Sequence, residues 1–230
     1  MSAIKVKVEA WKQYTLGEEI ANSITHGIGA LLSVAGLVVL IMLGVFYGNA
    51  FHVTCFTIYG TSLILLYLSS TLYHSLPGQT VKLIFKKLDH SAIFLLIAGS
   101  YTPLMLINID GVLGWAITIT VWILAILGII IKCLFISKFE KLSLLIYLLM
   151  GWLCLFASKE IVMNIPAHSL IFLIIGGLLY STGVIFYVWD NLPYNHGIWH
   201  IFVLAGSIFH YFSILTSFYN VAFHSSFQLS

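Results

Sequence analysis

Seven continuous apolar stretches are the feature that most constrains the fold of this chain. Each is about 20 residues long, enough for a helix to cross the hydrocarbon core of a bilayer. A membrane β-barrel would instead need segments of about 10 residues in which apolar and polar side chains alternate. We therefore predict an all-α integral membrane protein, a bundle of seven transmembrane helices. The predicted spans are 21–46, 51–75, 90–108, 112–132, 141–160, 168–189 and 196–219.

Short polar segments rich in Gly, Pro, Asn and Asp separate these stretches. The chain is expected to turn there, because lipid offers no partner to an unpaired backbone group. The longest segment, residues 75–89, joins the second and third spans. We expect residues 1–230 to form one membrane domain, with residues 1–17 as a short polar cytoplasmic segment. That segment lacks the compact apolar region of a cleaved signal peptide, so the first span should remain as an anchor.

The ten basic residues, all of them lysines, predict the orientation of the bundle. Cytoplasmic loops of membrane proteins carry an excess of positive charge. Nine lysines fall on one side of the predicted membrane and only Lys159 on the other, which predicts a cytoplasmic N-terminus and an outside C-terminus. The nine are Lys5, Lys7, Lys12, Lys82, Lys86, Lys87, Lys132, Lys138 and Lys141. No basic patch with interleaved aromatic residues points to nucleic acid.

Polar residues of four predicted helices lie at one depth, at the cytoplasmic ends of the spans. Glu18, Asn22 and His26 are four residues apart and so form one stripe on the first helix. Three further helices bring polar groups to the same depth, within about two turns of the inner surface. These groups are Ser70, His74, Asp89, His196 and His200. The agreement is an independent observation, because the topology rests on the lysines alone.

Several imidazoles and a carboxylate at one depth favour a zinc site. Neutral imidazole is a good zinc ligand, and His196 and His200, one helical turn apart, can reach one ion from a single helix. His74 would supply a third nitrogen and leave a fourth position for water. Asp89 could complete the shell or act as a base, and Ser70 could bind a carbonyl oxygen or the water. The groups expected to orient the ligands or the substrate are Glu18, Asn22 and His26.

His210 is predicted to lie within the membrane. It follows His200 by ten residues, about 15 Å along the same helix, and lies beside Ser207 and Tyr211. An ionisable residue at that depth is a candidate functional group, here one near the substrate or behind the ligands. A hydrogen bond to a serine or to a backbone carbonyl would also account for it.

The other histidines and the cysteines have simpler interpretations. His90 directly follows Asp89, and neighbours on a helix point about 100° apart, so the two are not expected to face one ion. His52, His168 and His224 lie at the outer interface, where a half-exposed imidazole is ordinary. The cysteines, which are too isolated to indicate a disulfide framework or a thiolate zinc site, are Cys55, Cys133 and Cys154.

Four motifs occur in order along the chain. They are EEIANSITHGIGA at 18–30, SSTLYH at 69–74, LDHSAIFLLIAGSYTP at 88–103 and NHGIWHIFVLAGSIFHYF at 195–212. Together they resemble the bacterial hemolysin III family, from about residue 14 to the end of the chain. That family is grouped with the progestin and adipoQ receptors and, more distantly, with the alkaline ceramidases.

The resemblance implies a seven-helix bundle with its N-terminus inside. It also implies a zinc ion held by His74, His196 and His200, with Asp89 linked to the metal through water. It does not transfer a substrate. The eukaryotic relatives suggest hydrolysis of lipid amides such as ceramide, whereas the bacterial branch is named for a cytolytic effect.

Three functions from different classes remain open. The one we favour is a zinc-dependent hydrolase of lipid amide or ester bonds, a ceramidase-like amidase that acts from the inner leaflet of the bacterial plasma membrane in lipid homeostasis. A cytolytic pore-former would need a secretable form or an amphipathic hairpin, and the sequence shows neither. A receptor or sensor of membrane state could hold structural zinc at the same residues. Membrane lipids are the expected partners, and the protein partners and the oligomeric state stay open.

Overall fold

The computed structural model describes residues 14–135 and 139–227, with the side chains of the last helix described to residue 222. All regular elements among these residues are helices. In order they are α1 Leu16–Tyr47, α2 Ala50–Ser75, α3 Gln79–Asn108, α4 Val112–Leu134, α5 Glu140–Gly151, a 3-10 helix Leu153–Ala157, α6 Ser158–Asn164, α7 Ala167–Val188 and α8 Asn195–Phe227. Outside the described residues lie Lys5, Lys7, Lys12, Lys138 and the side chain of His224.

The described chain contains seven helical segments that are long and apolar enough to cross a membrane. The protein is therefore a multi-pass membrane protein, as its apolar stretches predict. Five of the predicted spans agree with α1, α2, α4, α7 and α8, although α8 runs beyond the predicted end at 219. The third and fifth spans differ from the prediction in ways that matter for the site.

The third helix begins earlier than predicted. Gly78, with φ 98°, ends the turn after α2, and α3 starts at Gln79. The assignment of residues 75–89 to a loop was therefore wrong for most of that segment. Its lysines mark the membrane surface but do not break a helix, since no Gly or Pro follows Gly78 until Gly99. Hydropathy cannot distinguish a polar loop from the polar first turns of a long helix.

The fifth span is interrupted. After α5 the chain forms a 3-10 turn and then α6, so one predicted helix is in fact three segments. Tyr101 on α3 stabilises the break. Its hydroxyl oxygen accepts a hydrogen bond from the backbone N–H of Cys154 at 2.8 Å and lies 2.9 Å from the carbonyl oxygens of Met150 and Gly151. Irregular backbone at membrane depth needs such partners inside the protein.

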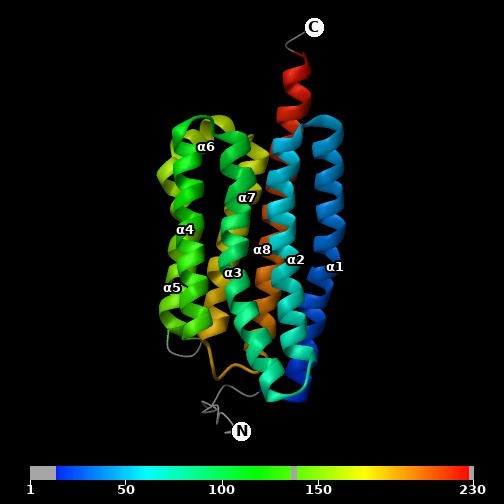
Figure 1. The fold of residues 1–230 in the computed structure, drawn as a ribbon, viewed down its shortest axis with the longest axis vertical. Coiled ribbons are helices and arrows are strands. Elements are labelled where there is room, and N and C mark those ends of the chain that lie inside the picture. Colours follow the sequence, from blue (N-terminus) through cyan, green and yellow to red (C-terminus); the bar gives the residue numbers. More distant parts are fainter. Residues whose placement is uncertain (1–13, 136–138, 228–230) are drawn as a thin grey trace, which may run out of the picture.

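The arrangement of the helices gathers four functional segments at one end of the bundle (Figure 1). The helix α1 packs against both α2 and α8, α3 lies between α2 and α4, and α7 runs along α8. The starts of α1, α3 and α8 and the end of α2 meet at the bottom of Figure 1, which we call the basal end. The described lysines near the basal end are Lys82, Lys86, Lys87, Lys132 and Lys141. Its cytoplasmic location remains a prediction.

Candidate metal centre

The basal end brings three of the predicted ligands together. One ring nitrogen of each of His74, His196 and His200 lies within 4.8 Å of the other two. The last turn of α2 carries His74, and the first two turns of α8 carry the other two residues. All three side chains are buried. We call them the histidine cluster, and its donor set could hold a metal ion.

A carboxylate of α1 orients the ring of His74. Nδ1 of His74 lies 2.6 Å from Oε2 of Glu19, which also forms an ion pair with Lys82. A carboxylate only accepts hydrogen bonds, so Nδ1 carries the proton and donates it. The other nitrogen, Nε2, is then an unprotonated donor of electrons to a metal. This atom is buried and has no hydrogen-bond partner, which is rare for a buried polar atom. A bound metal ion would provide the missing partner.

The backbone of α1 orients the ring of His200 in the same way. Nδ1 of His200 donates to the carbonyl oxygen of Asn22 at 3.2 Å and lies 3.3 Å from Oγ1 of Thr25. The ring of His26 stacks on that of His200, with centroids 3.5 Å apart and planes 11° apart. Both ring nitrogens of His26 are buried without a hydrogen-bond partner. Asn22 and His26 therefore both contact His200, and their role in orienting the ligands stays a prediction.

The third member of the predicted stripe, Glu18, has another role. Its backbone N–H donates to Oγ1 of Thr15, and its carboxylate accepts from the backbone N–H of Thr15 at 2.9 Å. This reciprocal pair is a capping box that starts α1. The carboxylate also accepts from the backbone N–H of Tyr194 at 3.3 Å, whereas the next residue, Glu19, makes the contact with His74. The spacing Thr-x-x-Glu was a sequence signal for the cap.

An aromatic residue that the sequence did not indicate covers the cluster. The ring of Tyr14, just before α1, lies 5.5 Å from that of His74 and 5.1 Å from that of His196. Burial raises the pKa of the Tyr14 phenol well above its usual value, so the hydroxyl stays protonated. Tyr14 belongs to the segment expected to be a polar tail, and nothing in its local sequence predicts the contact.

Asp89 and Ser70 lie beside the cluster but not in it. Asp89 is buried and lines one cavity together with His196 and His200. It is not a member of the group of candidate ligands, whose atoms lie within 4.8 Å of one another. The side chain of Ser70 on α2 faces Asp89, and Ser70 Oγ has no partner at normal hydrogen-bond geometry. The structure does not group Asp89 with the candidate ligands, and its link to the metal through water stays a prediction.

Two of the remaining histidines, His90 and His52, make local contacts. Nδ1 of His90 donates to the carbonyl oxygen of Lys86 at 2.8 Å, so this residue is held away from the cluster. His52, at the opposite end of α2 from His74, contacts Asn49 at 2.9 Å. All the cysteines are free, and none of the described ones joins the candidate metal site.

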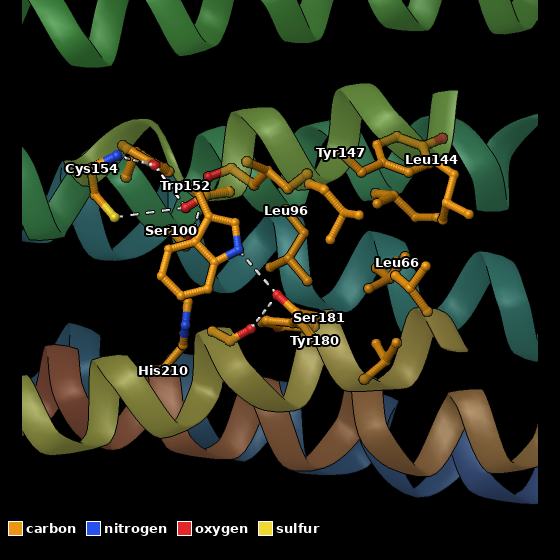
Figure 2. Close-up of a pocket in the computed structure, with 18 of the residues that line it drawn as sticks. Leu66, Leu96, Ser100, Leu144, Tyr147, Trp152, Cys154, Tyr180, Ser181 and His210 are labelled. Atoms are coloured by element: carbon orange, nitrogen blue, oxygen red, sulfur yellow. Dashed lines mark hydrogen bonds between the residues drawn. The ribbon is translucent and has the colours of Figure 1, made fainter. Parts of the chain in front are cut away.

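A cavity of about 320 Å³ extends from the histidine cluster into the bundle. Its walls come from all eight α-helices and the 3-10 helix and are mostly apolar. Figure 2 shows Leu144 and Tyr147 toward one end and Trp152, Cys154 and His210 toward the other. His210 therefore lies in the cavity and not at the cluster, and its Nε2 is buried without a hydrogen-bond partner.

Comparisons with known proteins agree on one family. The family model described as "Haemolysin-III related" matches residues 14–211. The chain is 52% identical to "Hemolysin-3" of Bacillus cereus over 198 residues, which cover 86% of this chain and 90% of that protein. It is 48% identical to the "Hemolysin-3 homolog" of Bacillus subtilis (strain 168) over 202 residues, with 88% and 95% covered.

A human protein is a more distant relative. The chain is 31% identical to the "Monocyte to macrophage differentiation factor" of Homo sapiens over 207 residues, which cover 87% of this chain and 84% of that protein. A search of solved structures gives no significant match. The matched segment contains α1 to α7 and the part of α8 that bears both of its cluster histidines, so the chain belongs to the hemolysin III family of membrane proteins.

Proposed function

We propose that this protein is a zinc-dependent hydrolase of amide or ester bonds in membrane lipids, with a role in membrane lipid homeostasis. The observation that carries the proposal is the histidine cluster at the head of an apolar cavity inside a membrane bundle. A site of this kind joins a metal's donor set to a space that suits hydrocarbon. With the basal end in the cytoplasm, substrate would enter from the inner leaflet of the bacterial plasma membrane.

Zinc fits the donor set of the cluster. Three neutral imidazoles match its ligand preference and leave one position open. The unpartnered Nε2 of His74 supports this choice, and Glu19 and Asn22 hold two of the rings by their Nδ1 atoms, as metal-ligating histidines commonly require. When bound, zinc would supply Lewis-acid activation of water and of a carbonyl oxygen.

Asp89 and Ser70 would carry the proton and the carbonyl contact. Asp89 lies in the cavity wall beside His196 and His200, where its carboxylate can take a proton from an attacking water and return it to the leaving group. Ser70 Oγ, which has no partner at hydrogen-bond geometry, can donate to the carbonyl oxygen of the substrate. Both roles follow from position and from ordinary acid–base chemistry.

Metal analysis of the purified protein tests the ligand assignment. We expect about one zinc per chain, because the three imidazoles build one site. His74→Ala and His200→Ala should each lose it. His52→Ala is the matched control, since His52 is on the same helix as His74 but at the other end, and it should retain zinc. Full zinc retention in both cluster variants would refute the assignment.

The role of Asp89 requires an activity measurement. Asp89→Asn should keep zinc and abolish cleavage of lipid amides and esters presented in mixed micelles, because an amide cannot accept the proton. Lipids extracted from the wild-type preparation would identify any trapped acyl product. An unchanged rate in Asp89→Asn would remove the residue from the mechanism. Bound zinc without any cleavage would favour a sensor in which the metal is structural.

A further inference from the structure

A buried lysine lies in the cavity wall at the basal end. Lys132, in the last turn of α4, is only 1% exposed, and it lines the cavity together with Asp89, His90 and Glu140. A lysine at a membrane surface normally extends its ammonium group into water. Lys132 instead points its charge into the protein, in the same cavity that reaches the histidine cluster.

No carboxylate among the described residues forms a close ion pair with Lys132. Lys86 forms an ion pair with Glu140 at 3.4 Å, whereas Lys132 makes no ion pair within 4 Å and no hydrogen bond to any described residue. Glu140 is itself half exposed, and electrostatic interactions link it to both lysines. Asp89 is a second carboxylate in the same wall, and it interacts electrostatically with Lys86. A buried ammonium group without a close partner is costly, so an anionic group that reached Lys132 would be stabilising.

A hydrogen bond between two helices fixes part of the wall around Lys132. The hydroxyl of Tyr147 on α5 donates to the carbonyl oxygen of His90 at 2.8 Å, which ties α5 to α3 next to the lysines. Figure 2 shows Tyr147 and Leu144 in this part of the cavity. Polar groups here meet the apolar walls that continue toward Trp152 and His210. The cavity therefore places the ammonium group of Lys132 beside an apolar interior, an arrangement that suits a lipid with an anionic headgroup.

We propose that Lys132, supported by Lys86, binds the phosphate of a lipid headgroup, and that the lipid's hydrocarbon chain occupies the cavity. The substrate class of the proposed hydrolase is then a phosphate-bearing lipid, an inference that rests on the proposed function for turnover but not for binding. A phosphate offers several strong acceptor oxygens to an ammonium group. A neutral lipid such as a ceramide leaves Lys132 without a partner.

The experiment compares two lipids that differ only in the phosphate. Dioleoyl phosphatidic acid and dioleoylglycerol are titrated, in detergent micelles, against the full-length protein. The wild type should bind the phosphatidic acid about tenfold more tightly than the diacylglycerol, as one charged hydrogen bond implies. Lys132→Gln should abolish the preference and Lys132→Arg should restore it. Lys141→Gln is the matched control, a basal lysine that is exposed and should change nothing.

Each outcome bears on the proposal. Equal affinities in the wild type, or a preference that survives in Lys132→Gln, would overturn it. Inorganic phosphate is added as a competitor, and binding of free phosphate as tight as that of the lipid would also overturn it, since the cavity would then contribute nothing. Loss of zinc or of hydrolysis would leave the ratio of the affinities for phosphatidic acid and diacylglycerol unchanged. A failure of the proposed hydrolase function can therefore be distinguished from a failure of the phosphate-binding proposal.

Discussion

At the residue scale, the candidate centre depends on hydrogen bonds to the Nδ1 atoms of its histidines. Glu19 and the carbonyl of Asn22, both on α1, fix the rings of His74 and His200 so that Nε2 stays unprotonated. A histidine ring whose tautomer and rotamer are not fixed in advance binds a metal less tightly. The geometry of α1 is therefore part of the metal centre, although α1 contributes no candidate ligand of its own.

Glu19→Gln tests this dependence. The amide can still accept a hydrogen bond but removes the charge that makes His74 a stronger ligand, so zinc affinity should fall about tenfold or more. Zinc competition with a chromophoric chelator measures the change. Glu18→Gln is the control, because Glu18 caps α1 whereas Glu19 contacts the ring of His74. Equal zinc affinities for the two variants would mean that Glu19 does not orient His74.

At the element scale, the sequence predicted the number of membrane-spanning segments better than it predicted where the helices begin and how they are rotated. The spacing of apolar residues predicted every span, and the lysine topology placed His74, His196 and His200 at one end before any contact was known. The contacts of Glu19 and Tyr14 could not be predicted, because they depend on the rotation of α1 about its axis. Neighbouring residues on a helix differ by about 100°, and hydropathy does not fix that angle.

Close packing of α1 on α2 sets the rotation. A Cβ at Gly29 would lie 2.5 Å from a ring carbon of Tyr67, whereas one at Gly27 would meet nothing closer than 3.7 Å. Gly29→Ala should therefore separate the helices and lower stability by about 1–3 kcal/mol, with weaker zinc binding. Gly27→Ala, two residues away, should behave like the wild type. Thermal unfolding in detergent, with zinc analysis of the same samples, measures both effects. Identical melting temperatures for the two variants would contradict the packing argument.

At the scale of the whole molecule, the two ends of the bundle differ along its long axis. The histidine cluster, Asp89 and the buried Lys132 lie toward the basal end, and the cavity leads from them into apolar surroundings. The sequence predicted the unequal distribution of lysines between the two ends. From the sequence alone, Lys132 indicated only which side of the membrane its helix end faces. Its burial follows from the way α3, α4 and α5 enclose it, which no local pattern records.

The orientation of this axis decides which leaflet supplies the lipid. Excess lysine at the basal end predicts that it faces the cytoplasm and that α8 ends outside. Alkaline phosphatase, which is active only outside the cytoplasm, should therefore be active when fused after Ser230 and inactive when fused after Leu76, between α2 and α3. A green fluorescent protein fusion at each point should give the opposite pattern. If phosphatase is active only after Leu76, the cluster faces the outer leaflet, and entry of the substrate from the inner leaflet is excluded.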